Sequence, residues 1–373
     1  MHKLAMKLSL FFLAGIWLAN GHLEAGDLSP AIAQLRSVSD ATQSAAIQAA
    51  WREIADAEIE QLVTILSGIK DASPLAENWL RSACDAVVER HLQDGGKLPV
   101  DDLRAFVLDF SQAPRARQAA YEWLVEAMPT APSELLPKML NDPSLDLRFD
   151  AVEHLLRQVP REKEGEQKIA VLERALDASR DYDQITGIVK QLEKLERSVD
   201  LTKHFGFVTE WHTIGPFDIA DGEGFEIAYP PEQSVDLKAK CTVEQGEIGW
   251  TKFIANGQRG ELNFIEGFGK TATGVMYAVA TFDSSQDQPA EIRYESSNGT
   301  KLWLNGEPVA ENKVYHSGSA ADQYIVPVNL REGENTILLK ICQTKRSEDW
   351  AHLWSFRLRV SDALGGAIRQ AGE

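Results

Sequence analysis

The sequence predicts a multidomain α-then-β protein: an N-terminal α-helical solenoid or bundle followed by a C-terminal antiparallel β-sandwich. The chain has 373 residues, more than one ordinary hydrophobic core accommodates. Apolar residues recur at i, i+3, i+4 and i+7 through residues 30–200, as in amphipathic helices. Near residue 205 the helical period stops, and Val, Ile, Tyr and turn pairs become frequent. We therefore expect a helical domain at 30–201 and a β-sandwich domain at 203–363.

The first 25 residues have the pattern of an export signal. A short basic segment, MHKLAMK, precedes the apolar run LSLFFLAGIWLA. This run has about a dozen residues, whereas a helix needs roughly 20 to span a bilayer. We interpret residues 1–25 as a signal peptide and expect a periplasmic, cell-envelope or extracellular protein with no membrane span after signal removal. An uncleaved apolar anchor is the alternative.

Charge and cysteine content narrow the possible partners. The formal net charge is −18, and an acidic chain repels phosphate backbones, so we expect no nucleic-acid partner. The three cysteines Cys84, Cys241 and Cys342 lack zinc-ligand spacing. We interpret them as small buried apolar residues. The sequence does not decide whether Cys241 and Cys342 form a disulfide.

The helical region contains a weak repeat. Four small residues follow one another at spacings of 37, 37 and 31 residues, namely Ala46, Ala83, Ala120 and Ala151. The stretch NDPSLDLRFDAVEHLL (141–156) adds an Asp-Pro turn, a serine placed as a helix cap and an alanine that allows close packing. It resembles HEAT-type α-helical repeats, which implies stacked helix pairs with a protein-contact surface. An irregular helical bundle is the alternative.

Strand-like segments fill the second half of the chain. Short turns separate them and no helical period intervenes, so we expect antiparallel pairing in a sandwich. The expected strands are 207–215, 261–267, 275–283, 290–296, 300–305, 324–330, 335–343 and 353–361.

Two Asn-Gly pairs flank the strand at 300–305. Asn298-Gly299 and Asn305-Gly306 supply the positive φ angles that tight hairpin turns need. The segment LWLNGEPV and the later VNLREGENTILLKI resemble the galactose-binding-like jelly roll, over roughly residues 205–362. That fold includes the sugar-binding domain of family 2 glycoside hydrolases and many carbohydrate-binding modules. The resemblance implies a module that binds a glycan or another protein, although some such modules bind no ligand.

Strand alternation suggests one candidate binding residue. In 290–296, Ile292 and Tyr294 share one face, while Glu291, Arg293 and Glu295 share the other. In 300–304, Leu302 and Leu304 share one face, so Trp303 and Lys301 lie on the opposite one. An exposed Trp303 would offer a stacking platform for a sugar, with Lys301 beside it. A covered Trp303 would only pack.

Two loops complete the candidate sites. Asp349, Trp350 and His352 precede the last strand and combine carboxylate, indole and imidazole groups that suit a sugar; a polar loop with one packing tryptophan is the alternative. Asp218, Asp221 and Glu223 form an oxygen-rich loop that could hold calcium, although they lack EF-hand spacing and a solvated acidic loop is the favoured interpretation.

Catalytic motifs are not found in the sequence, which contains no GxSxG, HExxH, P-loop or GxGxxG pattern. We therefore expect an exported, non-catalytic binding protein with no cofactor. One alternative is a structural or assembly protein of the cell envelope without a small ligand. The other is a polysaccharide-acting hydrolase that uses carboxylates such as Glu210 and Asp218.

Overall fold

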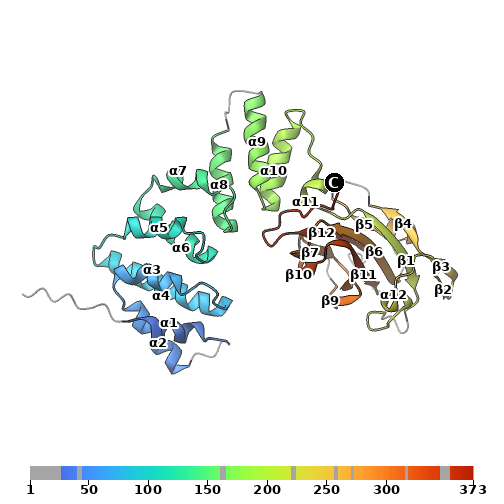
Figure 1. Cartoon of the computed structure of the whole chain (residues 1–373), viewed down its shortest axis with the longest axis horizontal. Coiled ribbons are helices and arrows are strands. Elements are labelled where there is room, and N and C mark those ends of the chain that lie inside the picture. Colours follow the sequence, from blue (N-terminus) through green and yellow to red (C-terminus); the bar gives the residue numbers. More distant parts are fainter. Residues whose placement is uncertain are drawn as a thin grey trace, which may run out of the picture. The chain divides into compact units, whose positions relative to one another are not determined.

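The computed structural model describes residues 27–39, 44–159, 165–219, 224–255, 259–269, 273–315, 318–344 and 353–372. Helices occupy the N-terminal half and antiparallel sheets the C-terminal half, which confirms the predicted fold class (Figure 1). The chain divides into two compact units, Met1–Ala131 and Pro132–Glu373. The change from helix to strand therefore falls inside the second unit, after residue 205.

Short amphipathic helices build the first unit. Serines begin two of them, since the Ser44 and Ser73 hydroxyls accept hydrogen bonds from backbone amides three residues later. Prolines stand in the first turns of others, where no amide partner is needed. The helices are α1 (Ser29–Arg36), α2 (Ala45–Ala55), α3 (Leu62–Ser67), α4 (Pro74–Gln93), α5 (Val100–Leu108) and α6 (Pro114–Ala127), with a 3₁₀ turn at Ile59–Gln61.

The second unit begins with helices and continues into strands. After α7 (Ala131–Leu135), which starts at the division, comes a 3₁₀ turn at Leu136–Lys138. The helices that follow are α8 (Leu145–Arg157), α9 (Glu166–Ala178), α10 (Tyr182–Glu193) and α11 (Leu201–Phe205). No helix in the described part of the chain combines the length and apolar character needed to cross a membrane.

Three of the four proposed repeat positions share burial, and two of them share a buried arginine. Ala83, Ala120 and Ala151 are buried, as close helix packing requires, whereas Ala46 is exposed and does not match them. Arg117 donates from Nε to the Val107 carbonyl at 2.8 Å, and Arg148 donates from Nε to the Leu140 carbonyl at 3.0 Å. Each buried guanidinium thus satisfies a carbonyl of the preceding turn of chain.

Two antiparallel sheets form the sandwich. The six-stranded sheet has the order β4-β1-β6-β11-β8-β9, and the four-stranded sheet has the order β10-β7-β12-β5. The strands are β1 (Glu210–Phe217), β4 (Thr251–Ile254), β5 (Leu262–Asn263), β6 (Gly274–Ser284), β7 (Gln288–Ser296), β8 (Gly299–Leu304), β9 (Glu307–Asn312), β10 (Tyr324–Leu330), β11 (Gly333–Gln343) and β12 (Ser355–Ser361). Two short helices, α12 (Pro230–Gln233) and α13 (Ile265–Phe268), lie in the connections.

Alternate residues of both sheets meet in the core. The β11 residues Ile337, Leu339 and Ile341 point inward, as do Phe356 and Leu358 of β12. The ring of Trp211 meets that of Phe356 edge to face, with centroids 5.0 Å apart. The apolar alternation seen in the sequence is therefore the pattern of a two-sheet interior.

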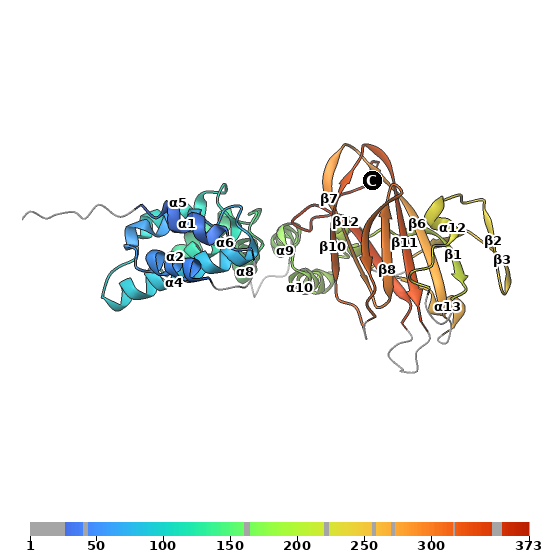
Figure 2. The ribbon, with the colours of Figure 1, turned by 90° about the horizontal axis from the view of Figure 1, so that it is seen from below.

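The outer face of the six-stranded sheet is also covered. A second apolar cluster forms there, and its cover comes from the chain after β1, including the hairpin of β2 (Lys240–Val243) and β3 (Gly246–Gly249). In Figure 2 this hairpin extends beside β1. The cluster contains Ile214, Phe217, Phe225, Val275, Tyr277, Val279, Trp303, Leu338 and Cys342.

Candidate functional site

Trp303, on which the sequence prediction centred, is covered by other side chains. Trp303 lies on the face opposite Leu302 and Leu304, as predicted, but its side chain is only 9% exposed. It belongs to the covered outer cluster rather than to an open sheet surface. The expected stacking platform is therefore replaced by packing. Lys301 next to it is engaged by Glu226 at 3.4 Å and Glu311 at 3.2 Å, with its ammonium over the Phe225 ring.

The two predicted loop sites are only partly described. Asp349, Trp350 and His352 lie outside the described residues, and so do Asp221 and Glu223. Asp218 is described, and its Oδ2 accepts a hydrogen bond from the Glu244 amide at 2.7 Å. No group of His, Cys, Asp or Glu side chains in the described part of the chain could hold a metal ion. A calcium site in this loop stays a prediction.

The carboxylates suggested for a hydrolase do not form a pair. Glu210 begins β1, while Asp218 follows the end of the same strand. Eight residues of extended chain separate them by ~25 Å, whereas glycosidase carboxylates stand about 5–9.5 Å apart. Glu210 is exposed and pairs with Lys252 at 2.8 Å. These two residues therefore cannot act together on one bond.

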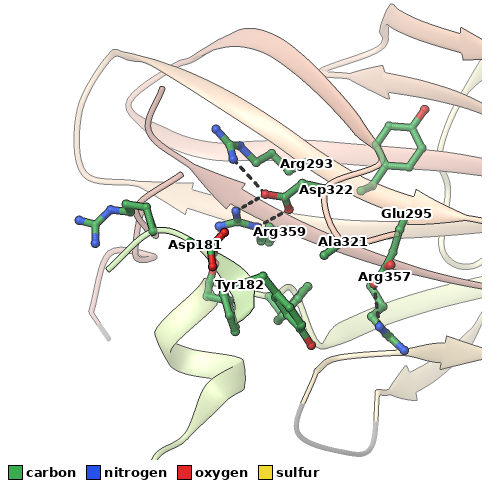
Figure 3. Close-up of a pocket in the computed structure, with 12 residues that line it drawn as sticks. Asp181, Tyr182, Arg293, Glu295, Ala321, Asp322, Arg357 and Arg359 are labelled. Carbon is green, nitrogen blue, oxygen red and sulfur yellow. Dashed lines mark hydrogen bonds and ion pairs between the residues drawn. The ribbon is translucent and has the colours of Figure 1, made fainter. Parts of the chain in front are cut away.

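A pocket that the sequence did not predict lies on the outer face of the four-stranded sheet. Its volume is about 140 Å³. Strand alternation places Arg293 and Glu295 of β7 beside Arg357 and Arg359 of β12 on this face, because Arg357 pairs across the strands with Glu295 and Arg359 with Arg293. Figure 3 shows these side chains with Asp322, from the segment before β10, among them.

Asp322 is the centre of an ion-pair network in this pocket. Its Oδ1 accepts from Arg359 Nε at 2.7 Å, and its Oδ2 accepts from Arg293 Nη1 at 2.9 Å (Figure 3). Burial raises the pKa of this carboxyl, but the hydrogen bonds and charges of Arg359 and Arg293 outweigh that effect and hold the pKa below its usual value. The network thus keeps Asp322 ionised and fixed in orientation.

Arg359 also connects the sheet to the helical segment before it. Its Nη1 donates to the Phe205 carbonyl at 3.3 Å and to the Gly365 carbonyl at 2.9 Å. The chain turns sharply between α11 and this face at Gly206, whose φ of +74° favours glycine. A Cβ on Gly206 would also lie 2.9 Å from that of Ala367. This turn delivers the rings of Phe205 and Phe207 to the edge of the pocket.

Aromatic rings line the side of the pocket that the helices contribute. Tyr182, the first residue of α10, stacks on Phe205 with ring centroids 5.5 Å apart and an interplanar angle of 23°. Arg259 lies over Tyr182 at 4.9 Å from the ring centroid. The Phe207 ring lies 5.7 Å from that of Phe205 and is half-buried. Phe207 and Tyr182 are therefore the half-buried aromatic side chains of the pocket, whereas Phe205 and Tyr294 are buried.

Two hydrogen-bond donors at the pocket have no partner in the described part of the chain. They are the Nε atoms of Arg180 and Arg357, both buried. The rest of the Arg357 guanidinium is engaged, because Nη1 donates to Glu295 Oε1 at 2.7 Å and Nη2 lies 3.4 Å from Glu261 Oε2. A buried donor without an acceptor costs about 1–3 kcal/mol. A ligand oxygen that reached either Nε–H would remove that cost.

A second cluster of buried polar groups lies under the cover of the six-stranded sheet. Lys340 of β11 is fully buried, and its ammonium donates to the carbonyls of Phe225 at 2.9 Å and Ile227 at 2.7 Å. It also donates to Glu232 Oε1 at 2.8 Å, which the Tyr277 hydroxyl bonds as well. Burial raises the pKa of Tyr277, so the phenol stays protonated and donates. These five groups satisfy one another, and the bonds from Lys340 hold the cover to the sheet.

Comparisons with known proteins give only partial likenesses. No protein-family model and no curated protein matches the chain. Among solved structures, the chain is similar to a family 35 carbohydrate-binding module from Clostridium thermocellum, with 15% identity over 26% of this chain and 75% of that one, at a TM-score of 0.18. A family 35 module from an environmental isolate gives 17% identity, 25% and 73% coverage and a TM-score of 0.17.

A further likeness covers more of this chain at lower sequence identity, and the matched protein is an enzyme. A β-glucosidase from Kluyveromyces marxianus is 10% identical over 75% of this chain, at a TM-score of 0.27, and the chain spans 36% of that protein. Likenesses this weak transfer no ligand or activity to this chain. The resemblance of the helical region to HEAT-type repeats stays a prediction.

Proposed function

We propose that this chain is an exported, non-catalytic binding protein whose β-sandwich binds the terminal residue of a glycan. The ligand enters the pocket on the outer face of β7 and β12. One observation carries the proposal: two arginines that line one pocket, Arg180 and Arg357, each keep a buried Nε–H without a partner among the described residues, and the half-buried ring of Phe207 lines the same pocket. Sugars present hydroxyl oxygens around an apolar ring face, and this combination complements both.

The size of the pocket indicates how much of a glycan it accepts. Its volume of about 140 Å³ is below the ~300–1,000 Å³ of sites for drug-sized ligands. One terminal sugar or a small polar substituent fits, whereas an internal stretch of polysaccharide does not. The carboxylates of Asp322 and Glu295 are held by arginines and serve as oriented acceptors for hydroxyl groups.

The helical region has a separate role in this proposal. It is a scaffold with HEAT-like repeats that presents a surface to protein partners. The buried arginine at the same place in two helical hairpins, Arg117 and Arg148, supports a repeated unit. Export, directed by residues 1–25, would bring both parts to the cell envelope or outside the cell.

A glycan array with the purified full chain, followed by calorimetry with the best-bound glycan, tests the sandwich proposal. Arg357→Lys keeps the positive charge but removes the Nε–H and the planar fork. We expect it to weaken binding about tenfold, since a hydrogen bond to a charged donor contributes ~1.5–3 kcal/mol. Phe207→Leu should also weaken binding, because it removes the ring while keeping an apolar side chain.

Arg331→Lys is the matched control. Arg331 is exposed after β10 and lies outside the pocket, so this variant should bind like the original chain. Melting temperatures of all variants separate lost binding from lost folding. A chain that binds no glycan on the array, or whose Arg357→Lys variant binds glycan equally well, would contradict the proposal. An assembly role in the cell envelope would then be the better explanation.

A further inference from the structure

The helices α8 and α10 form the walls of a groove in the second unit. Its volume is about 800 Å³. The side chain of Gln184 on α10 joins the walls, since its Nε2 donates to the Phe149 carbonyl at 3.3 Å and to Glu153 Oε1 at 3.0 Å on α8. With α9 as the antiparallel connection between them, α8 and α10 run in the same direction (Figure 1). The residues that line the groove run from Phe149 to Val159 and from Asp181 to Gln191, about 15 Å along each helix.

The exposed apolar side chains of the groove lie towards the N-terminal end of α8, and Glu153, bonded to Gln184, follows them along the groove. Phe149 is 40% exposed, and Leu145, in the adjoining hollow, is 45% exposed. Both apolar side chains therefore lie at the surface and not in the core. Ile188 is buried below them and Leu156 lies further along α8. Exposed aromatic and aliphatic side chains at a concave surface are typical of helix surfaces that contact another chain.

Gly187 gives an independent sign that something approaches this groove closely. It lies in the middle of α10 and lines the groove. Its backbone has ordinary helical angles, and a Cβ there would meet no atom within 4 Å. Neither strain nor crowding inside this chain therefore requires glycine. A glycine in a helix interior is less favourable than alanine, and a common reason for one is the close approach of another backbone.

Charge differs between the two ends of the groove. At the N-terminal ends of α8 and α10 stand three acidic residues, Asp146, Asp181 and Asp183. The arginines at this end are engaged with backbone carbonyls, Arg148 with Leu140 and Arg180 with Asp177 and Ser179. At the opposite end stand Arg157, the last residue of α8, and Lys168, in the first turn of α9.

From these features we infer that the groove binds an extended peptide segment of a partner protein, with apolar side chains between a basic residue and an acidic residue. The basic residue lies by Asp181 and Asp183, and the acidic residue by Arg157 and Lys168. At ~3.3 Å per residue, about five intervals between successive residues span the groove, so it holds about six residues. The peptide backbone passes over Gly187, where no side chain intervenes. This inference rests on the proposed scaffold role of the helical region and not on the glycan pocket.

Fluorescence anisotropy with labelled hexapeptides and the full chain tests the inference. The probe set has Leu, Phe or Ala at the four central positions, with Lys at one end and Glu at the other. Like-charged sets carry Lys at both ends or Glu at both ends. We expect the mixed-charge peptides to bind at least about threefold more tightly than either like-charged set, because each correct ion pair adds a modest contribution.

Substitutions at Gly187 separate binding from folding. Gly187→Ala should raise the melting temperature by about 2 °C, as a better helix former in open space. Gly187→Gln fills the groove and should weaken peptide binding about tenfold or more, the effect of forcing a side chain into an occupied space. Its binding to any glycan found for the sandwich should be unchanged, so the peptide and glycan proposals can fail separately.

Three outcomes would overturn the inference. The first is that no hexapeptide of the mixed-charge set binds. The second is that Gly187→Gln binds the peptides as well as the original chain does. The third is sedimentation that shows a dimer which Gly187→Gln dissociates, because the occupant of the groove would then be a second copy of this chain.

Discussion

The two outer faces of the sandwich are covered in different ways. On the six-stranded sheet the cover is apolar, and its buried cation, Lys340, has three oxygen partners. On the four-stranded sheet the cover is made of ion pairs around Asp322, with helix-derived rings at the side. The first face is closed by packing. The second leaves a pocket and two guanidinium Nε–H groups that lack partners in the described part of the chain.

This difference shows where a ligand can gain binding energy. A fully packed apolar face has no unmet hydrogen bonds, so a ligand would first have to displace the cover. Charged side chains on a sheet satisfy one another only where their geometry allows, and the groups left over favour an added oxygen. The glycan proposal follows from the unmet hydrogen bonds of the ion-paired face. Substitutions in the side chains that cover each face test the contrast between the two.

Lys340→Met should have the largest effect on the covered face. It leaves the Glu232 carboxylate without its cation and removes the donor from the carbonyls of Phe225 and Ile227. Removing one partner of a buried ion pair costs ~3–5 kcal/mol. We expect the free energy of unfolding of the sandwich, measured in urea by tryptophan fluorescence, to fall by about that amount.

Lys240→Met is the control for this change. Lys240 is in the same cover, on β2, but its pair with Glu247 is exposed, so its removal should leave stability nearly unchanged. The double variant Lys340→Met with Glu232→Gln should recover part of the loss, because the uncompensated charge is gone. A loss below about 1 kcal/mol for Lys340→Met would mean that the ammonium does not hold the cover.

Trp303→Ala should cost somewhat less and should not affect glycan binding. The indole is 9% exposed within the apolar cluster, which places the loss at the lower end of the ~3–5 kcal/mol typical for Trp→Ala in a core. Urea unfolding measures the loss. Ile325→Ala on β10, where the side chain is 49% exposed, should change stability little. Weaker glycan binding by a folded Trp303→Ala variant would show that Trp303 contributes to the glycan site.

Strand alternation predicted from the sequence which residues share a face, but not what covers each face. Trp303 lies opposite Leu302, and Arg293 opposite Ile292, as the alternation indicates. The cover of the cluster that contains Trp303 comes from residues more than 50 positions earlier, such as Phe225. Such long-range packing depends on how the sheets and connections fold together, which a local period does not contain.

The pocket was missed although its signal was present. In SFRLRVS (355–361), Arg357 and Arg359 alternate with Phe356 and Leu358, so they had to share the face opposite the core. Their pairing with Glu295 and Arg293 needed the order of the strands, with β12 beside β7. Asp322 comes from an irregular segment with no period at all. The sequence could therefore indicate the arginines but not the network that they form.

Asp322→Asn should have the smallest effect of the three on stability, but a distinctive dependence on pH. The pKa of Asp322 is below its usual value in the folded chain. The unfolded chain therefore binds more protons near the ordinary aspartate pKa of about 3.9, and the ionised carboxylate stabilises the fold above that pH. This stabilisation is lost as pH falls through the lower, folded pKa. The amide that replaces the carboxyl group cannot ionise, so at pH 7 the variant should be about 1–3 kcal/mol less stable.

The difference between the two chains should therefore shrink as the pH falls below the ordinary aspartate pKa, which urea unfolding at a series of pH values measures. Asp283→Asn, at an exposed position of β6, controls for a general loss of negative charge. A difference that stays constant from pH 7 down to about 2 would show that the amide acts only through lost packing or altered hydrogen bonds. In that case Arg293 and Arg359 would not depend on the charge of Asp322, and the contrast between an ion-paired face and an apolar face would no longer hold.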